Sequence, residues 1–201
     1  MSVINSSPTR GPIFSSKLIN KLQKILLRFS SFLFLFIAIS LFLIMLSYNI
    51  GDPSFRSATS ESTKNLFGSF GSHIADPLHL SLGISYLLLV FIILVWSWRL
   101  TFDDIKKRMI SRLVFFPLPL ATTAVFLSTY PPSSEWQFTY GLGGIFGDTI
   151  LVFLLETGFL DPNTLLHIIS VSFALLTFFL TGFITATDLK EAEKLIKMFF
   201  L

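Results

Sequence analysis

The sequence predicts an all-α membrane protein with four transmembrane helices and a short outer (periplasmic) half-helix between the third and the fourth. Hydrophobic residues make up 52% of the 201 residues and charged residues only 13%, about half the charged fraction of a soluble domain. The apolar residues also fall in blocks long enough to cross a bilayer, which takes about 20 residues of helix. We therefore expect one membrane-embedded bundle without a separate soluble domain.

The N-terminal segment 1–28 is polar at first and then basic. Within it, Lys17–Arg28 places leucine and isoleucine near one helical face and basic residues on another, which predicts a helix lying on the membrane surface. The first span follows at about Phe29–Tyr48. A signal peptide is the rival interpretation, but the apolar run is too long for one and no small-x-small cleavage site follows it.

The second span (about 76–98) and the fourth (about 161–186) both begin with an Asp-Pro pair. Asp76 and Asp161 can each cap a helix, and the proline that follows fits its first turn. The sequence therefore predicts the same capping device at the start of both spans.

The third span, about 113–130, has Pro117 and Pro119 near its start, so we expect a kink there. After it comes the segment 142–156, whose apolar core Ile145–Leu155 is too short to cross a bilayer. A re-entrant or interfacial half-helix is the better interpretation, and the sequence does not decide between the two.

The tail 188–201 is amphipathic, and Asp188 with Glu191 three residues later resembles a capping box. We expect this tail to be cytoplasmic and to begin a linker. Together with segment 1–28 and the membrane domain 29–187, it completes the predicted organisation of the chain.

The basic residues are distributed unevenly between the two sides of this four-span topology. One side receives 13 of them and the other receives 2, which together are all 15. By the positive-inside rule, both termini are then cytoplasmic. The 13 are Arg10, Lys17, Lys21, Lys24, Arg28, Arg99, Lys106, Lys107, Arg108, Arg112, Lys190, Lys194 and Lys197, and the 2 are Arg56 and Lys64.

No catalytic, cofactor-binding or metal-binding residues are expected. The chain has no cysteine and no Gly-Lys pair, which excludes thiolate ligands and a P-loop. The run "GLGGIFG" fails the dinucleotide pattern, and Gly143 and Gly147 instead form a G-x-x-x-G that lets helices pack closely. None of His73, His79 and His167 makes an H-x-x-x-H pair. We expect His79 and His167 to reach water or a backbone carbonyl near the outer interface.

Several short motifs, in order, resemble the N-terminal four-helix membrane domain of the FtsK/SpoIIIE DNA translocases. They are "SYNIGDPSF", "NLFGSFGSHIADPLHLSLGISYLLL", "GGIFGDTI" and a Thr-Gly pair near the end of the fourth span. The resemblance covers about residues 25–186. Ile50-Gly51 departs from the family pattern just before the first Asp-Pro.

The resemblance implies a membrane anchor at the division septum of a bacterium, acting in cell division and chromosome partition. It implies an oligomer in the inner membrane that contacts other cell-division membrane proteins and does not itself bind DNA. The family's ATPase motor is expected to be absent from this chain, which would then not be an enzyme. A small multipass channel or transporter subunit is the alternative, although all four spans lack charged residues beyond the Asp that opens the second and the fourth. A lipid-acting enzyme using Asp52 and Asp148 is a third.

The polar turn after the first span is expected to be ordered. Pro53 fixes its backbone, while Asp52 and Ser54 can accept hydrogen bonds from nearby amides. Phe55 is expected to tuck against the outer ends of the helices, on the surface of 66–70. The residues proposed for structural or interaction roles are Asp52, Pro53, Phe55, Gly68, Gly71, Asp76, Gly143, Gly144 and Gly147.

Overall fold

The computed structural model describes residues 15–102 and 112–185, whose regular secondary structure is all helical, without a strand. The helices are α1 (Ser16–Leu46), α2 (Gly68–Leu82), η1 (Gly83–Ser85), α3 (Tyr86–Phe102), η2 (Leu113–Phe115), α5 (Pro117–Ser128), α6 (Gly144–Thr157) and α7 (Pro162–Ile184). The expected amphipathic tail 188–201 and the polar start of the chain lie outside the described residues.

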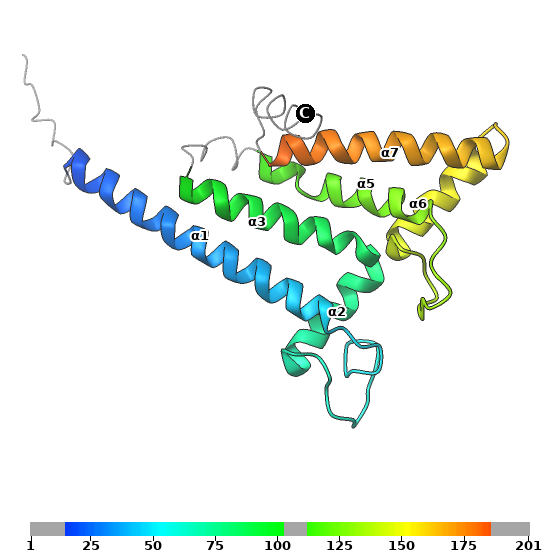
Figure 1. Ribbon diagram of the computed structural model, residues 1–201, viewed down its shortest axis with the longest axis horizontal. Coiled ribbons are helices and arrows are strands. Elements are labelled where there is room, and N and C mark those ends of the chain that lie inside the picture. Colours follow the sequence, from blue (N-terminus) through cyan, green and yellow to red (C-terminus); the bar gives the residue numbers. More distant parts are fainter. Residues whose placement is uncertain (1–14, 103–111, 186–201) are drawn as a thin grey trace, which may run out of the picture.

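Four apolar helices lie side by side in a row, in the order α1, α3, α5, α7 (Figure 1). Three stretches are long and apolar enough to cross a membrane: Ser16–Leu46, Gly68–Thr101 and Pro162–Ile184. The shorter α5 is also apolar. The all-helical architecture is confirmed. Helices α1 and α7 lie at opposite edges of the row.

Helix α1 is continuous from Ser16 to Leu46. A surface helix that turned into a span would need a break near Arg28, and the described residues show none there. The expected surface-lying helix before the first span is therefore wrong in this respect. The physical reason is that Lys17–Phe36 contains no glycine or proline, so nothing interrupts the backbone hydrogen bonding.

The start predicted for the second span is also wrong. Helix α2 begins at Gly68 and passes through Asp76 and Pro77, and the break comes instead at Gly83, where η1 separates α2 from α3. Gly83 has φ +56° and ψ −137°, a backbone conformation suited to glycine. The oxygens of Asp76 are occupied by side chains from elsewhere, so this residue does not act as a cap.

The other proline signals are confirmed. The third span is interrupted at Phe116, between η2 and α5, and Pro117 opens α5. The carboxylate of Asp161 caps α7 by accepting hydrogen bonds from the amides of Asn163 (3.2 Å) and Thr164 (3.3 Å).

Polar side chains join neighbouring helices within the row. Ser31 of α1 and Ser97 of α3 exchange hydrogen bonds, each hydroxyl donating to the other's carbonyl oxygen at 2.7 and 2.8 Å. Thr177 of α7 donates to Thr122 of α5 at 3.0 Å. Trp96 of α3 donates its indole N–H to the carbonyl of Ile184 at 3.1 Å. Such bonds help align helices where hydrophobic burial gives little direction.

Candidate interaction surface at the loop end

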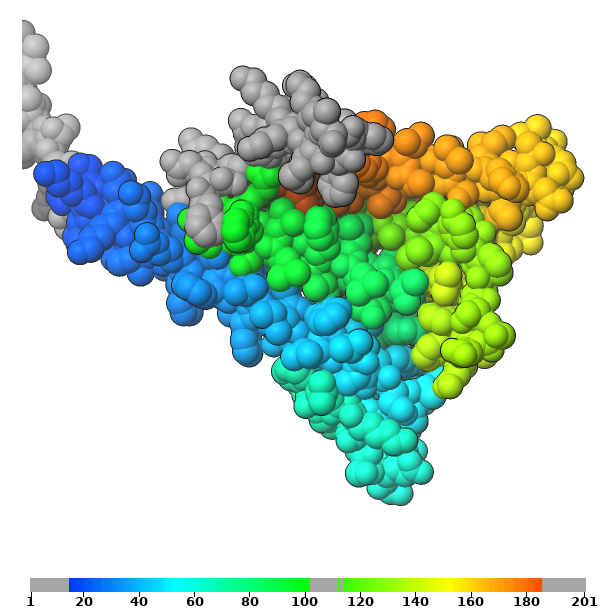
Figure 2. Space-filling view, viewed as in Figure 1, coloured from blue at the N-terminus to red at the C-terminus, as the bar shows by residue number. Residues whose placement is uncertain are grey.

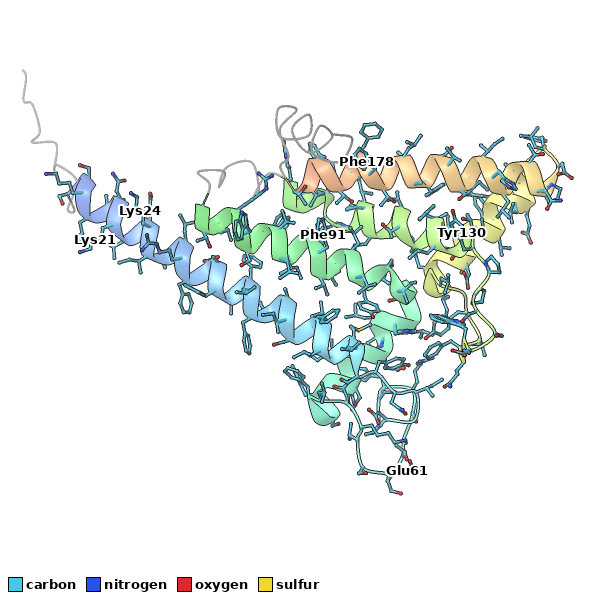
Figure 3. All side chains as sticks on the ribbon, viewed as in Figure 1. Lys21, Lys24, Glu61, Phe91, Tyr130 and Phe178 are labelled. Carbon is cyan, nitrogen blue, oxygen red and sulfur yellow. The ribbon has the colours of Figure 1, made fainter. Side chains whose placement is uncertain are left out.

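Two long loops, 47–67 and 129–143, lie at the end of the molecule opposite the start of α1 (Figures 1 and 3). We call the first the α1–α2 loop and the second the α5–α6 loop. Most of the residues singled out by the sequence lie in these loops or in the helices that they join. The contacts in this region decide which side chains are held inside and which are presented outward.

The α1–α2 loop is held together by Asp52, whose side chain is only 3% exposed. Its carboxylate accepts hydrogen bonds from the backbone amides of Lys64 and Asn65, both at 2.9 Å. Asn65 in turn donates from its side-chain amide to the carbonyl of Ile44 at 2.8 Å. The two ends of the loop are thereby tied to each other and to the end of α1.

The tip of the same loop is tied to α2. Ser54 Oγ accepts from the amides of Arg56 and Ser57, both at 3.2 Å, and Ser72 Oγ donates to the carbonyl of Pro53 at 2.5 Å. The segment therefore forms a compact turn, and the bond between Ser72 and Pro53 reaches across 19 residues of sequence.

Asp76 of α2 lies at the centre of a polar contact with the α1–α2 loop. The Arg56 guanidinium forms an ion pair with its carboxylate, with Nε donating to Oδ2 at 2.9 Å and a terminal nitrogen donating to Oδ1. The Tyr48 hydroxyl also donates to Oδ1, at 2.9 Å. Burial, reinforced by the hydrogen bond with Asp76, raises the pKa of Tyr48. Its hydroxyl therefore stays protonated and available as a donor.

A cluster of rings links the two loops. His79, which is 6% exposed, stacks on Tyr48 with 4.7 Å between ring centroids, and its Nδ1 lies 2.8 Å from the hydroxyl of Tyr140. Phe138 contacts both His79 and Tyr48, and Trp136 donates to the carbonyl of Tyr140 at 2.6 Å. His79 thus meets the other loop rather than water. The aromatic spacing of "WQFTY" was the signal that sequence reasoning missed.

Phe55 does not tuck against the helices, so this expectation is wrong. Its side chain is 80% exposed and touches the ring of His73 edge-on, with 4.9 Å between centroids. The reason is that the inside of the turn is filled by polar contacts of Asp52 and Ser72, while Phe70 itself points outward at 70% exposure. We define the exposed apolar patch as Ile50, Phe55, Leu66 and Phe70.

The glycines near the start of α6 lie against other backbones. A β-carbon at Gly147 would lie 2.5 Å from Ser128 Oγ of α5, and one at Gly144 (φ +71°) would lie 2.5 Å from the amide nitrogen of Gly83. Gly143 likewise meets Ala124 and Ser128. These positions have no room for a side chain, and α6 therefore approaches both α5 and the α2–α3 break at backbone distance.

The remaining glycines that the sequence singled out differ in their surroundings. A β-carbon at Gly71 would collide with the side chains of Asn65 and Phe67, whereas Gly68 has φ +59° and open space around it. Gly71 thus allows α2 to pack on the loop that precedes it, and Gly68 supplies a backbone turn at the start of α2.

Asp148 is also engaged by groups of the chain. Ser128 Oγ donates to its Oδ1 and the amide of Gly141 donates to its Oδ2, both at 2.6 Å. Asp52 and Asp148 are therefore both acceptors that hold a loop in place.

The comparisons with known proteins agree with this architecture. Residues 23–192 match the family described as the 4TM region of DNA translocase FtsK/SpoIIIE. No solved structure matches the chain.

Similar proteins include three called DNA translocase FtsK. The chain is 33% identical to the one from Rhizobium meliloti over 156 residues, which cover 73% of this chain and 17% of the relative. It is 34% identical to the one from Azospirillum brasilense over 117 residues, which cover 57% of this chain and 18% of the relative. It is 30% identical to the one from Rickettsia bellii over 147 residues, which cover 73% of this chain and 18% of the relative. The chain thus corresponds to less than a fifth of the length of these relatives. It belongs to the FtsK/SpoIIIE family of DNA translocases, to whose 4TM region most of its length corresponds.

Proposed function

We propose that this chain is the membrane anchor of a bacterial septal DNA translocase and acts in cell division and chromosome partition. The observation that supports this most strongly is the family match, which runs from α1 to beyond the end of α7. In this proposal the anchor sits in the inner membrane, oligomerises, and recruits division proteins. It carries out no ATP hydrolysis and does not contact DNA.

The proposed orientation places both termini in the cytoplasm. Six of the eight basic residues in the described ranges gather at one end of the row: the start of α1 carries four, the end of α3 carries Arg99, and Arg112 precedes η2. The other two, Arg56 and Lys64, lie in the α1–α2 loop. The α1–α2 and α5–α6 loops lie toward the other end (Figure 3). A cytoplasmic excess of Lys and Arg is the usual determinant of orientation.

Single cysteines at Ser57, Ser111 and Ser133 should report this orientation, because the chain has no native cysteine. With an impermeant thiol reagent added to intact cells, positions 57 and 133 should be labelled, and position 111 only after the membrane is permeabilised. Labelling of position 111 but not of position 57 in intact cells would reverse the assignment.

The exposed apolar patch is the surface that we propose for contacts with division partners. Phe55 is held on a turn that is fixed by Asp52, Ser54 and Ser72, so it is presented without a large loss of conformational freedom on binding. An ordered loop carrying exposed apolar side chains outside the helices is typical of interaction sites.

Phe55→Ala in a full-length translocase that carries this region should reduce septal localisation and division. Because the side chain is mostly exposed, membrane insertion and protein level should stay normal. Localisation of a fluorescent fusion and cell length measure the effect. The matched control is Phe91→Ala, which removes a half-exposed ring from α3 (Figure 3) and should leave localisation intact. Normal septal localisation of Phe55→Ala would remove this patch from the proposal.

A further inference from the structure

The four basic residues at the start of α1 form a stripe along one side of the helix, an arrangement that orientation in the membrane does not require. Lys17, Lys21, Lys24 and Arg28 are all exposed and follow one another at intervals of four, three and four residues. At 3.6 residues per turn, these intervals keep all four within roughly 60° around the helix axis. Lys21 and Lys24 are labelled in Figure 3, where α1 extends past the end of α3.

No negative charge of α1 balances this stripe. The helix contains no Asp or Glu, and the first acidic residue of the whole sequence is Asp52. Among residues 15–102 and 112–185, the ion pair that forms is that of Arg56 with Asp76, far from the stripe along the chain. Within the part of the chain that the structure describes, no acidic side chain forms an ion pair with these four cations.

The length of α1 places the stripe at the edge of the bilayer. The helix has 31 residues, about 46 Å at 1.5 Å per residue, while the hydrocarbon core is about 30 Å thick. Counting about 20 residues back from Leu46 brings Arg28 to the hydrocarbon boundary. Lys24, Lys21 and Lys17 then follow outward through the headgroup layer, in reach of phosphates by extension of their long side chains.

The other side of the same turns is apolar and uncovered. Leu18, Leu22, Ile25 and Leu26 are exposed, and Figure 2 shows the blue start of α1 standing clear of the other coloured helices. A helix with an apolar side and a basic side at this depth has the chemistry of an interfacial lipid contact.

We propose that the Lys17–Arg28 stripe is a binding site for anionic phospholipid headgroups, so that α1 gathers anionic lipids around the anchor. The occupant is a lipid phosphate, recognised by charge complementarity and by its position next to the apolar side of the same turns. The proposal rests on insertion of the helix in a membrane and does not depend on the septal role.

The test uses the full 201-residue chain in vesicles, with a Phe32→Cys substitution carrying a small fluorophore. Phe32 lies one turn inward from Arg28 and is 70% exposed, and the absence of native cysteine makes the label specific. The fluorophore is quenched by brominated lipid that lies next to it. Its quenching by brominated phosphatidylglycerol in phosphatidylcholine is compared with its quenching by brominated phosphatidylcholine in phosphatidylglycerol. The ratio gives the relative affinity of the site next to the stripe for the two lipids.

We expect phosphatidylglycerol to be preferred at least fivefold, and the preference to fall with added salt. Each charge removed should reduce it by up to roughly fivefold, so Lys17→Gln, Lys21→Gln, Lys24→Gln and Arg28→Gln together should bring the two lipids to similar affinity. Lys17→Arg, Lys21→Arg, Lys24→Arg and Arg28→Lys together keep the charge, so this variant should keep the preference for phosphatidylglycerol.

A matched control exchanges residues without altering composition. Swapping Lys21 with Gln23 keeps the composition and the net charge but moves one cation to another side of the helix, and the preference should fall. Equal preference in the swapped chain would overturn the stripe as the site, leaving only general charge attraction. No preference in the parent chain would overturn lipid binding altogether, as would be the case if an acidic protein or the chain's own Asp103 and Asp104 were the partner.

Discussion

Gly83→Ala should lower the free energy of unfolding by roughly 2–6 kcal/mol, the sum of backbone strain and overpacking. Gly83 has φ +56°, which an L-residue adopts only with strain. A β-carbon there would also lie 2.5 Å from the amide nitrogen of Gly144 and 2.6 Å from the carbonyl carbon of Leu142. Both obstacles are backbone atoms, so no side-chain rotation can relieve the collision.

The substitution should disturb more than the α2–α3 break. The amide of Ile84 donates to the carbonyl of Leu142 at 2.9 Å, so the same contact positions the α5–α6 loop and the start of α6. Reversible unfolding in mixed detergent, followed by circular dichroism, measures the loss.

Gly182→Ala is the matched control for Gly83→Ala. Gly182 lies inside α7, and a β-carbon there would have no atom within 4 Å. Alanine at such a helical position should stabilise by about 0.5–1 kcal/mol. The two Gly→Ala changes are thus expected to have opposite signs. If Gly83→Ala were as well tolerated as Gly182→Ala, the close approach of the α2–α3 break to α6 would not exist in the membrane.

Local signals in the sequence predicted those parts of the fold that depend on local chemistry. The cap of α7 by Asp161, the interruption before Pro117 and the apolar helices all follow from residues within one or two turns of each other. The short helix after the glycine cluster also appears, as α6 (Gly144–Thr157). Whether α6 lies at the outer surface stays a prediction.

The errors came where a distant partner changes the role of a residue. Asp76 has the sequence context of a cap, but Arg56 and Tyr48, 20 and 28 residues away, supply its hydrogen bonds. The side chain of His79 meets Tyr140 across 61 residues. The outward position of Phe55 follows from polar contacts made beneath it. None of these pairings leaves a periodic pattern in the sequence. The aromatic spacing of "WQFTY" is a signal for a ring cluster, but it does not identify His79 as the partner.

The two Asp-Pro pairs allow a direct test of whether local sequence or a distant partner sets the role of the aspartate. The same substitution at the two sites should have unequal effects. Serine is as good a helix N-cap as aspartate, so Asp161→Ser should change the free energy of unfolding by only a few tenths of a kcal/mol. Asp76→Ser should cost about 1–3 kcal/mol, since it removes the acceptor for both Arg56 and Tyr48. We place the value in this modest range because the Arg56 side chain is 43% exposed, which weakens the ion pair through solvent screening.

The loss of stability in Asp76→Ser should arise largely from the contact with Arg56. The substitution should also loosen the α1–α2 loop. In a double-mutant cycle, Arg56→Gln should add little to Asp76→Ser, because the ion pair is already gone. Proteolysis within 55–63 should become faster in Asp76→Ser and stay unchanged in Asp161→Ser, because the guanidinium–carboxylate contact ties the tip of the loop to α2. Equal losses of stability at the two aspartates, with additive effects of Arg56→Gln and Asp76→Ser, would mean that Asp76 acts as an ordinary cap, as its sequence alone predicts.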